Sequence, residues 1–168
     1  ICQYLKEKYQ VNSYRFSTML RDILDRIYVE KTRENLQDLS TFLRQRYGQD
    51  IMSKVITKDV ENDPNPIVAV EGIRRPTDIT YLQELDNFYL IYITADTELR
   101  WKRMVLRQEN PDEADKTFEQ FLKDEQAEAD KLIKELGKQA KYTLINNGGT
   151  EEFYNKMEEI LKTIQHAS

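Results

Sequence analysis

An acidic residue and two arginines directly follow one of the most apolar runs of the sequence. Residues 67–70 form this run, and Glu71, Gly72, Arg74 and Arg75 come after it. A short apolar run bounded by turn residues predicts a buried strand. Ligands of open α/β sheets bind at the carboxyl ends of the strands. Because carboxylates bind Mg²⁺ and paired guanidinium groups bind phosphate oxygens, this loop is a candidate site for magnesium and phosphate.

Each charged residue of this loop also has a structural interpretation. Glu71 has the chemistry to hold magnesium through water, but it is equally a partner for Arg74. Arg74 has the donors for phosphate, but it is also placed to pair with Asp78 or Glu71. Ion pairs and functional sites draw on the same residue types, so both interpretations stay open.

Strand and helix patterns alternate along the rest of the chain. Residues 14–16 are a short strand candidate, and mainly apolar runs predict further strands at 67–70, 89–94 and 142–146. Ser17 and Asp96 are suitable caps for the helices that follow the first and third strands. Further helices are predicted at 1–9, 50–62, 79–85, 117–136 (ended by Gly137) and 151–164, and segment 32–38 fits a polar connection or a short helix. This order predicts an α/β fold in which helices enclose a parallel sheet.

Composition limits the class of protein. The chain of 168 residues has a net charge of -5, which argues against a general nucleic-acid binder, and its length predicts one domain. No run reaches the roughly 20 apolar residues of a membrane span. Cys2 is the only cysteine and cannot form an internal disulfide. A reducing, cytoplasmic setting is therefore expected, with a small molecule rather than a nucleic acid or membrane as partner.

Four segments, taken together and in order, resemble the small phosphate-loop kinases. They are residues 14–21, 70–74, 93–107 and 145–148. The nearest groups are nucleoside monophosphate kinases and dephospho-coenzyme A kinases. The resemblance implies a three-layer α/β/α sandwich of the P-loop NTPase type. It also implies ATP-dependent phosphoryl transfer to a nucleotide or nucleotide-like acceptor, with ATP and Mg²⁺ as cofactors.

In the resembled family, residues at two of these segments bind the acceptor. Ser17, Arg21 and Arg74 take this role by resemblance, with an acceptor-binding region at about 17–50, and Glu71 matches the acid that holds magnesium. Acceptor discrimination is expected in segment 28–46. The alternative for Arg21 is an ordinary solvated helix arginine.

The other two segments match the ATP side of the family. Arg103 and Arg107 are four residues apart and share a helix face, at the start of a lid region at about 103–120 whose arginines neutralise charge on the transferred group. Asn146 and Asn147 match residues that border adenine. The alternatives are an exposed basic helix face and an ordinary Asn-Gly-Gly turn.

The family's glycine-rich phosphate loop is not in this sequence. Its glycines are at positions 48, 72, 137, 148 and 149, and none fits the G-x-x-x-x-G-K pattern. The resemblance therefore implies a first strand and phosphate loop upstream of Ile1. The alternative is a catalytically silent nucleotide-binding or scaffold protein that has lost the loop. The sequence predicts no oligomeric state.

Overall fold

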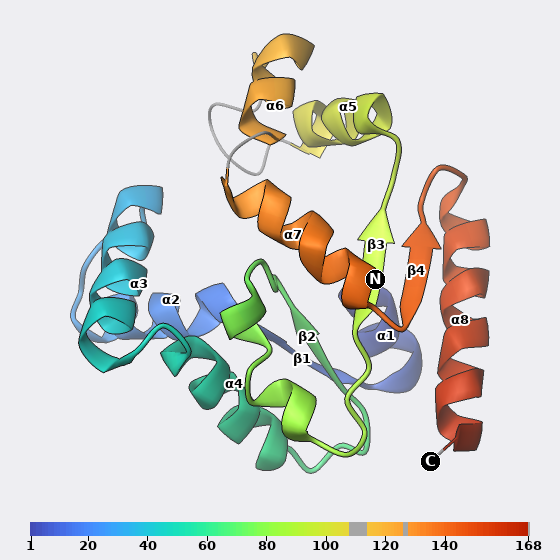
Figure 1. Cartoon of the computed structure of the whole chain (residues 1–168), viewed down its shortest axis with the longest axis horizontal. Helices are drawn as coiled ribbons and strands as arrows, with labels where there is room; N and C mark the ends of the chain where they lie inside the picture. Colours follow the sequence, from blue (N-terminus) through green and yellow to red (C-terminus); the bar gives the residue numbers. More distant parts are fainter. Residues whose placement is uncertain (108–113, 126–127, 168) are drawn as a thin grey trace. The chain divides into compact units, whose positions relative to one another are not determined.

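The computed structural model describes residues 1–107, 114–125 and 128–167 (Figure 1). The chain divides into two compact units, Ile1–Phe88 and Tyr89–Ser168, and each is described by itself. The prediction of a single kinase-like domain over residues 1–168 stays a prediction.

The first unit is built on two parallel strands. Strand β1 (Asn12–Arg15) pairs with β2 (Val68–Glu71) in a register that sets Asn12 beside Val68 and Arg15 beside Glu71. The strands predicted at 14–16 and 67–70 are thus both present. Because the pair is parallel, both strands end at the same edge, and this edge bears the charged residues singled out from the sequence.

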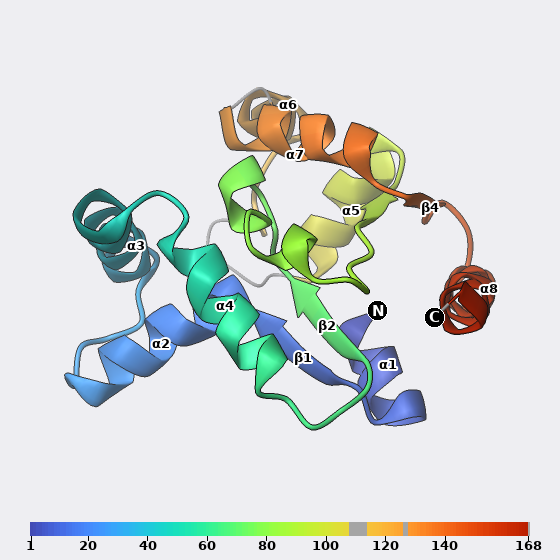
Figure 2. The same cartoon turned by 60° about the horizontal axis from the view of Figure 1, so that its bottom comes forward.

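Four α-helices belong to the described part of this unit. They are α1 (Cys2–Tyr9), α2 (Phe16–Arg26), α3 (Arg33–Tyr47) and α4 (Ile51–Glu61). Helices α1, α2 and α4 pack against β1, and α3 packs against α2 and α4 (Figure 2). The core of the unit joins α2, α4 and the segment after β2 through Phe16, Leu20, Met52, Ile56 and Leu82.

Two local predictions in this unit were wrong, and a third was right in type but too short. Ser17 does not cap α2, because β1 runs directly into the helix and Arg15 takes the N-cap position in an extended conformation. Segment 32–38 belongs to the longer helix α3, which the Thr32 hydroxyl caps by accepting a hydrogen bond from the N–H of Asn35 at 3.1 Å. The helix predicted at 79–85 is absent, since that range contains only the 3₁₀ turn η2 (Leu82–Glu84), and another 3₁₀ turn, η1 (Pro76–Asp78), comes before it.

The second unit repeats the parallel arrangement with other helices. Strand β3 (Ile91–Thr94) pairs with β4 (Tyr142–Ile145), so that Thr94 lies beside Ile145. The helices are α5 (Thr97–Arg107), α6 (Phe118–Glu125), α7 (Glu128–Gln139) and α8 (Thr150–Ala167). Helix α7 packs against β3, and α8 packs against β4 (Figure 1).

Gly137 does not end a helix as predicted. The structure has α6 and α7 where one long helix was expected at 117–136, and Gly137 lies inside α7. A Cβ atom at Gly137 would lie 2.9 Å from ring atoms of Tyr92 on β3. The glycine therefore serves the close approach of α7 to β3, and the helix continues past it.

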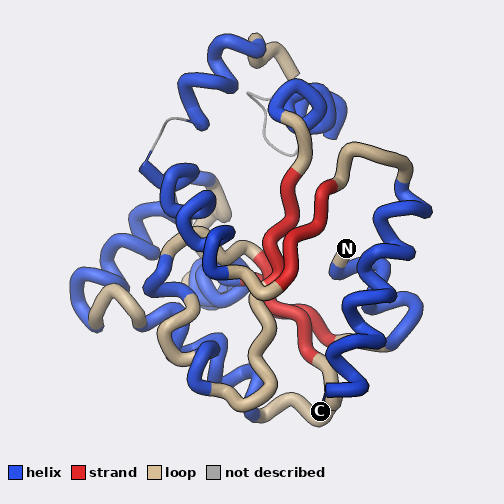
Figure 3. The backbone as a smooth tube through the Cα atoms, turned by 45° about the vertical axis from the view of Figure 1, so that its right-hand side comes forward, coloured by secondary structure: helices blue, strands red, loops and turns tan. Residues whose placement is uncertain are grey.

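The four strands form two short sheets instead of one continuous sheet. Figure 3 shows them as two pairs, and both pairs are parallel. The α/β class and the parallel pairing are confirmed.

All four residues of β2 are half-buried, whereas its apolar sequence predicted a strand covered on both faces. No helix within the described ranges is long and apolar enough to cross a membrane.

Candidate anion site at the carboxyl end of β2

The chain turns sharply where β2 ends. Gly72 follows Glu71 with a φ of +82°, a conformation that L side chains rarely adopt. The turn leads into the segment with Arg74, Arg75 and the 3₁₀ turn η1, which starts at Pro76. Glycine and proline thus fix the loop at both ends, and the two arginines lie between them.

Glu71 pairs with Arg15, which the sequence analysis did not consider as its partner. The Arg15 Nε donates to Glu71 Oε1 at 3.0 Å, and Arg15 Nη2 lies 2.9 Å from the same oxygen. The thiol of Cys2 lies close by, and its pKa is raised by burial and by the negative charge of Glu71. This arrangement does not fit a magnesium ligand as it stands, because Arg15 already neutralises the carboxylate.

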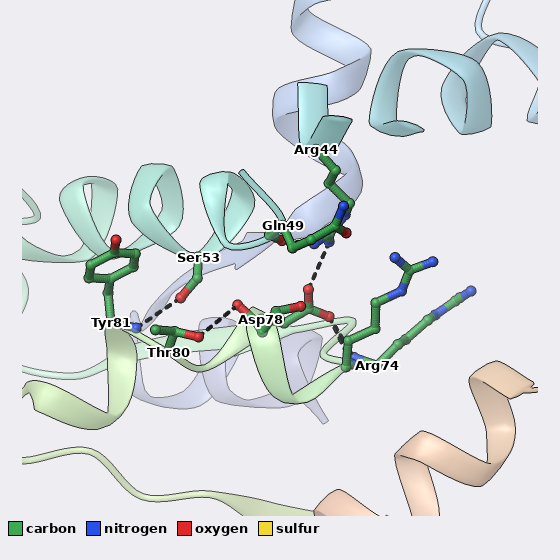
Figure 4. A network of polar contacts seen from close by, with 9 residues as sticks. Arg44, Gln49, Ser53, Arg74, Asp78, Thr80 and Tyr81 are labelled. Atoms are coloured by element: carbon green, nitrogen blue, oxygen red, sulfur yellow. Dashed lines mark hydrogen bonds and ion pairs between the residues drawn. The ribbon is translucent and has the colours of Figure 1, made fainter. Parts of the chain in front are cut away.

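A buried carboxylate holds the backbone of the arginine loop. Asp78 Oδ2 accepts the backbone N–H groups of Arg74 and Arg75, each at 3.0 Å. Its Oδ1 accepts a hydrogen bond from Arg44 Nη2 on α3 at 2.8 Å. Figure 4 shows Asp78 between Arg44 and the Arg74 backbone, with the Arg74 side chain extending away from the carboxylate. The Arg74–Asp78 interaction considered from the sequence thus exists, but through the backbone and not through the guanidinium.

The guanidinium groups of Arg21 and Arg74 face solvent. Both residues are exposed, and within the described part of the chain neither guanidinium makes an ion pair or hydrogen bond. Their sequence neighbours Leu20 and Ile73 pack in one hydrophobic cluster. The segments of Arg21 and Arg74 therefore border one hydrophobic cluster, and Ser17 is half-buried in the first turn of α2.

The strand ends of the second unit use their arginine differently. Arg103 Nη1 donates to the backbone carbonyl of Asn146 at 2.6 Å, and Nη2 donates to that of Gly148 at 3.4 Å. The Asn147 Oδ1 accepts the backbone N–H of Asp96 at 2.8 Å. These contacts join α5 and the β3–α5 turn to the β4–α8 turn. Arg103, Asn146 and Asn147 are thus engaged in fixing turns, while their roles in the lid and at adenine stay predictions.

Arg107 is the last residue of α5 and is exposed. It belongs to the second unit, whereas Arg21 and Arg74 belong to the first. Residues 108–113 of the predicted lid lie outside the described residues. The convergence of these arginines on one phosphate site therefore stays a prediction.

Sequence reasoning missed the residues that position this loop. A signal for Arg15 exists, because the parallel register sets the last residue of β1 beside Glu71. Arg44 has no comparable signal, since it lies 34 positions from Asp78 on a helix that was not predicted at that length. Among the described residues, no group of three or more His, Cys, Asp or Glu side chains is arranged to hold a metal ion.

Sequence comparisons identify relatives over most of the chain, although no protein-family model matches it. A UPF0200 protein of Sulfurisphaera tokodaii is 29% identical over 147 residues, which cover 86% of this chain and 81% of the relative. A UPF0200 protein of Saccharolobus solfataricus is 24% identical over 132 residues, covering 77% and 69%. A UPF0200/UPF0201 protein of Archaeoglobus fulgidus is 27% identical over 147 residues, covering 85% of this chain and 45% of the relative. The homologues of this chain are thus archaeal proteins of the UPF0200 family.

Proposed function

We propose that this protein is an ATP-dependent small-molecule kinase of the P-loop NTPase type. It would transfer a phosphoryl group to a nucleotide or a nucleotide-like acceptor, as nucleoside monophosphate kinases and dephospho-coenzyme A kinases do. The part of the reaction that this chain's own residues support is recognition of the acceptor phosphate. The single cysteine supports a reducing, cytoplasmic setting.

The observation that carries the proposal is that Arg74 has an exposed guanidinium on a backbone held in place by a hydrogen bond. Its guanidinium is exposed and unengaged among the described residues, while its backbone N–H is held by Asp78 at 3.0 Å. A guanidinium fork binds two phosphate oxygens at once, and a fixed backbone lowers the entropy lost on binding. Its place, at the carboxyl end of a parallel strand, is where ligands of α/β proteins bind.

The acceptor-binding region at about 17–50 supplies the second cation. Arg21 lies on α2, whose Leu20 shares a hydrophobic cluster with Ile73. Ser17, in the first turn of the same helix, adds a hydroxyl donor. Two guanidinium groups on segments that share one core can hold a phosphate in a set orientation, which is the main contribution a protein makes to phosphoryl transfer. Helix α3 would complete the acceptor pocket.

ATP and Mg²⁺ enter this proposal through the family resemblance alone. In the resembled family ATP is the phosphoryl donor, and Arg103, Arg107, Asn146 and Asn147 match residues on the ATP side of that family. The glycines of this sequence form no phosphate loop, and Glu71 is paired with Arg15 at 2.9 Å. The described residues therefore do not fit a triphosphate or magnesium site.

Acceptor binding by the complete gene product tests the proposal. Titration calorimetry would compare AMP, CMP, GMP, UMP and dephospho-coenzyme A with the corresponding nucleosides. We expect at least one phosphorylated compound to bind about tenfold tighter than its phosphate-free form, with the difference lost in Arg74→Ala. Lys54→Ala is the matched control, because it removes one exposed positive charge from α4. A coupled assay for ADP release then tests transfer, and no ADP release with any acceptor would refute the kinase.

A catalytically silent nucleotide-binding or scaffold protein is the second candidate. The pairing of Glu71 with Arg15 favours it, because the carboxylate that matches the family's magnesium ligand is already neutralised. The same two measurements separate the candidates. Phosphate-dependent binding together with ADP release supports the kinase, and binding without ADP release supports the silent protein.

A further inference from the structure

A buried pair of opposite charges lies behind the arginine loop. Arg44 is 8% exposed and Asp78 is 3% exposed, and their nearest charged atoms are 2.8 Å apart. Removing two charged groups from water costs free energy, and their mutual attraction seldom exceeds this cost by much. A protein with two apolar side chains of similar volume in place of a buried ion pair is therefore often equally stable. Stability alone is therefore a weak explanation for this pair, and its hydrogen bonds indicate what it fixes in place.

Both carboxylate oxygens of Asp78 are used. Oδ1 accepts from Arg44, and Oδ2 accepts the N–H groups of Arg74 and Arg75 at 3.0 Å. These two backbone donors are consequently not available to a ligand, and an anion at this loop would meet the guanidinium groups instead. Asp78 thus sets the direction in which the Arg74 side chain leaves the backbone.

Arg44 connects this loop to the region predicted to bind the acceptor. Its Nη1 donates to the backbone carbonyl of Gln49, in the turn between α3 and α4. One guanidinium therefore joins the end of α3, the α3–α4 turn and, through Asp78, the backbone of Arg74 (Figure 4). A displacement of α3 would therefore be passed on to the arginine loop through the Arg44 side chain.

We propose that Asp78 and Arg44 are positioning residues that orient Arg74 toward the phosphate of a nucleotide-like acceptor and couple this orientation to α3. This inference rests on the proposed acceptor site and adds residues that act through Arg74 rather than by touching the ligand. A misplacement of about 1 Å in a positioned group can reduce its effect about a hundredfold. Loss of the pair should therefore weaken phosphate recognition as well as stability.

The test measures phosphate preference, the ratio of nucleoside to nucleoside monophosphate dissociation constants, for the complete gene product. AMP and adenosine, CMP and cytidine, GMP and guanosine, and UMP and uridine are the probe pairs, and thermal unfolding is recorded alongside. Asp78→Asn keeps the size of the side chain but removes its charge. Tyr81→Phe is the control, because it removes a 3.0 Å hydrogen bond to Asp50 in the same region without touching the arginine loop.

We expect Asp78→Asn to lower the phosphate preference about tenfold while nucleoside affinity stays constant, and Tyr81→Phe to change only the melting temperature. An Asp78→Asn variant that melts earlier but keeps the preference would overturn the positioning role. If Asp78→Asn does not fold, the same measurement is made on Arg44→Lys, which keeps the positive charge but loses the planar guanidinium. A lowered phosphate preference in Arg44→Lys supports the positioning role, and an unchanged preference overturns it.

The outcome also separates this inference from the proposed function. If Arg74→Ala loses the phosphate preference and both Asp78→Asn and Arg44→Lys keep it, the acceptor site stands and the positioning role is wrong. If the unaltered protein shows no phosphate preference with any pair, both proposals are wrong.

Discussion

The strand ends of the two units contain similar residues but use them in opposite ways. At the end of β2, the buried Asp78 holds the backbone, and the guanidinium of Arg74 is left to solvent. At the ends of β3 and β4, the guanidinium of Arg103 holds the backbone by donating to the carbonyls of Asn146 and Gly148. In the first unit a carboxylate fixes a loop that presents cations, and in the second unit a cation fixes the loops.

This difference distinguishes arginines that the fold uses from arginines that it leaves for a ligand. Arg100 of α5 makes an ion pair with Glu125 of α6 and donates to the carbonyl of Ala95 at 2.9 Å. Such donors are already satisfied, and a ligand would have to displace a protein partner. Arg21 and Arg74 carry no such cost in the described structure, so the first unit is the better candidate for anion binding.

The largest effect is expected for Asp78→Ala. The change leaves the Arg44 guanidinium buried without its partner and frees two backbone N–H groups, so the free energy of unfolding should fall by about 3 to 5 kcal/mol. Denaturant unfolding monitored in the first unit would measure this loss. Arg44→Met/Asp78→Ala should recover part of it, because no unpaired charge remains buried. A loss below about 1 kcal/mol would show that the carboxylate does not hold the loop.

Arg74→Ala should affect binding and not stability. The guanidinium is exposed and makes no described contact, so unfolding should change by less than about 0.5 kcal/mol. Loss of one charge-assisted contact should weaken binding of a phosphorylated acceptor by about 1.5 to 3 kcal/mol. Calorimetry on Arg74→Ala and Lys54→Ala would measure this difference. Equal affinities in both variants would place Arg74 with the structural arginines and remove the contrast between the two units.

The sequence predicted the strands of both sites better than the side-chain partners. Apolar runs located β2, β3 and β4, since burial favours such runs, and β1 was located at 14–16 although its residues are mostly polar. The sequence offered Arg74 as a partner for Glu71, but the structure has Arg15. This pairing depends on strand register, which sets Arg15 beside Glu71. Gly137 was misjudged because its role, close approach to Tyr92, depends on a neighbouring strand. Tertiary contacts of this kind leave no local pattern in one sequence.

A smaller effect is expected for Arg103→Ala in the second unit. The variant loses donors to two backbone carbonyls of the β4–α8 turn, and the free energy of unfolding should fall by about 1 to 2 kcal/mol, since water can replace part of the contact. Lys102→Ala is the matched control on the same helix, because its exposed pair with Glu98 contributes little. Equal unfolding curves for the two variants would contradict a structural use of Arg103.

The smallest effect is expected at Asp63, another carboxylate of the first unit. Asp63 accepts hydrogen bonds from Tyr14 and Asn12, whereas Asp78 is paired with the buried Arg44. The Tyr14 hydroxyl donates to Asp63 Oδ2 at 2.6 Å, and this bond holds the pKa of Asp63 below its usual value of 3.8. A carboxyl group whose pKa is lower in the folded than in the unfolded state stabilises the fold at a pH above its unfolded-state pKa. This contribution is lost as the pH falls through the folded-state pKa. Tyr14→Phe should therefore be less stable than the unaltered protein near pH 7, and the difference should shrink below about pH 3.8. Melting temperatures of both proteins from about pH 7 to about pH 3 would measure this. A difference that stays constant over that range would mean that the hydroxyl contributes through packing and not through the charge of Asp63.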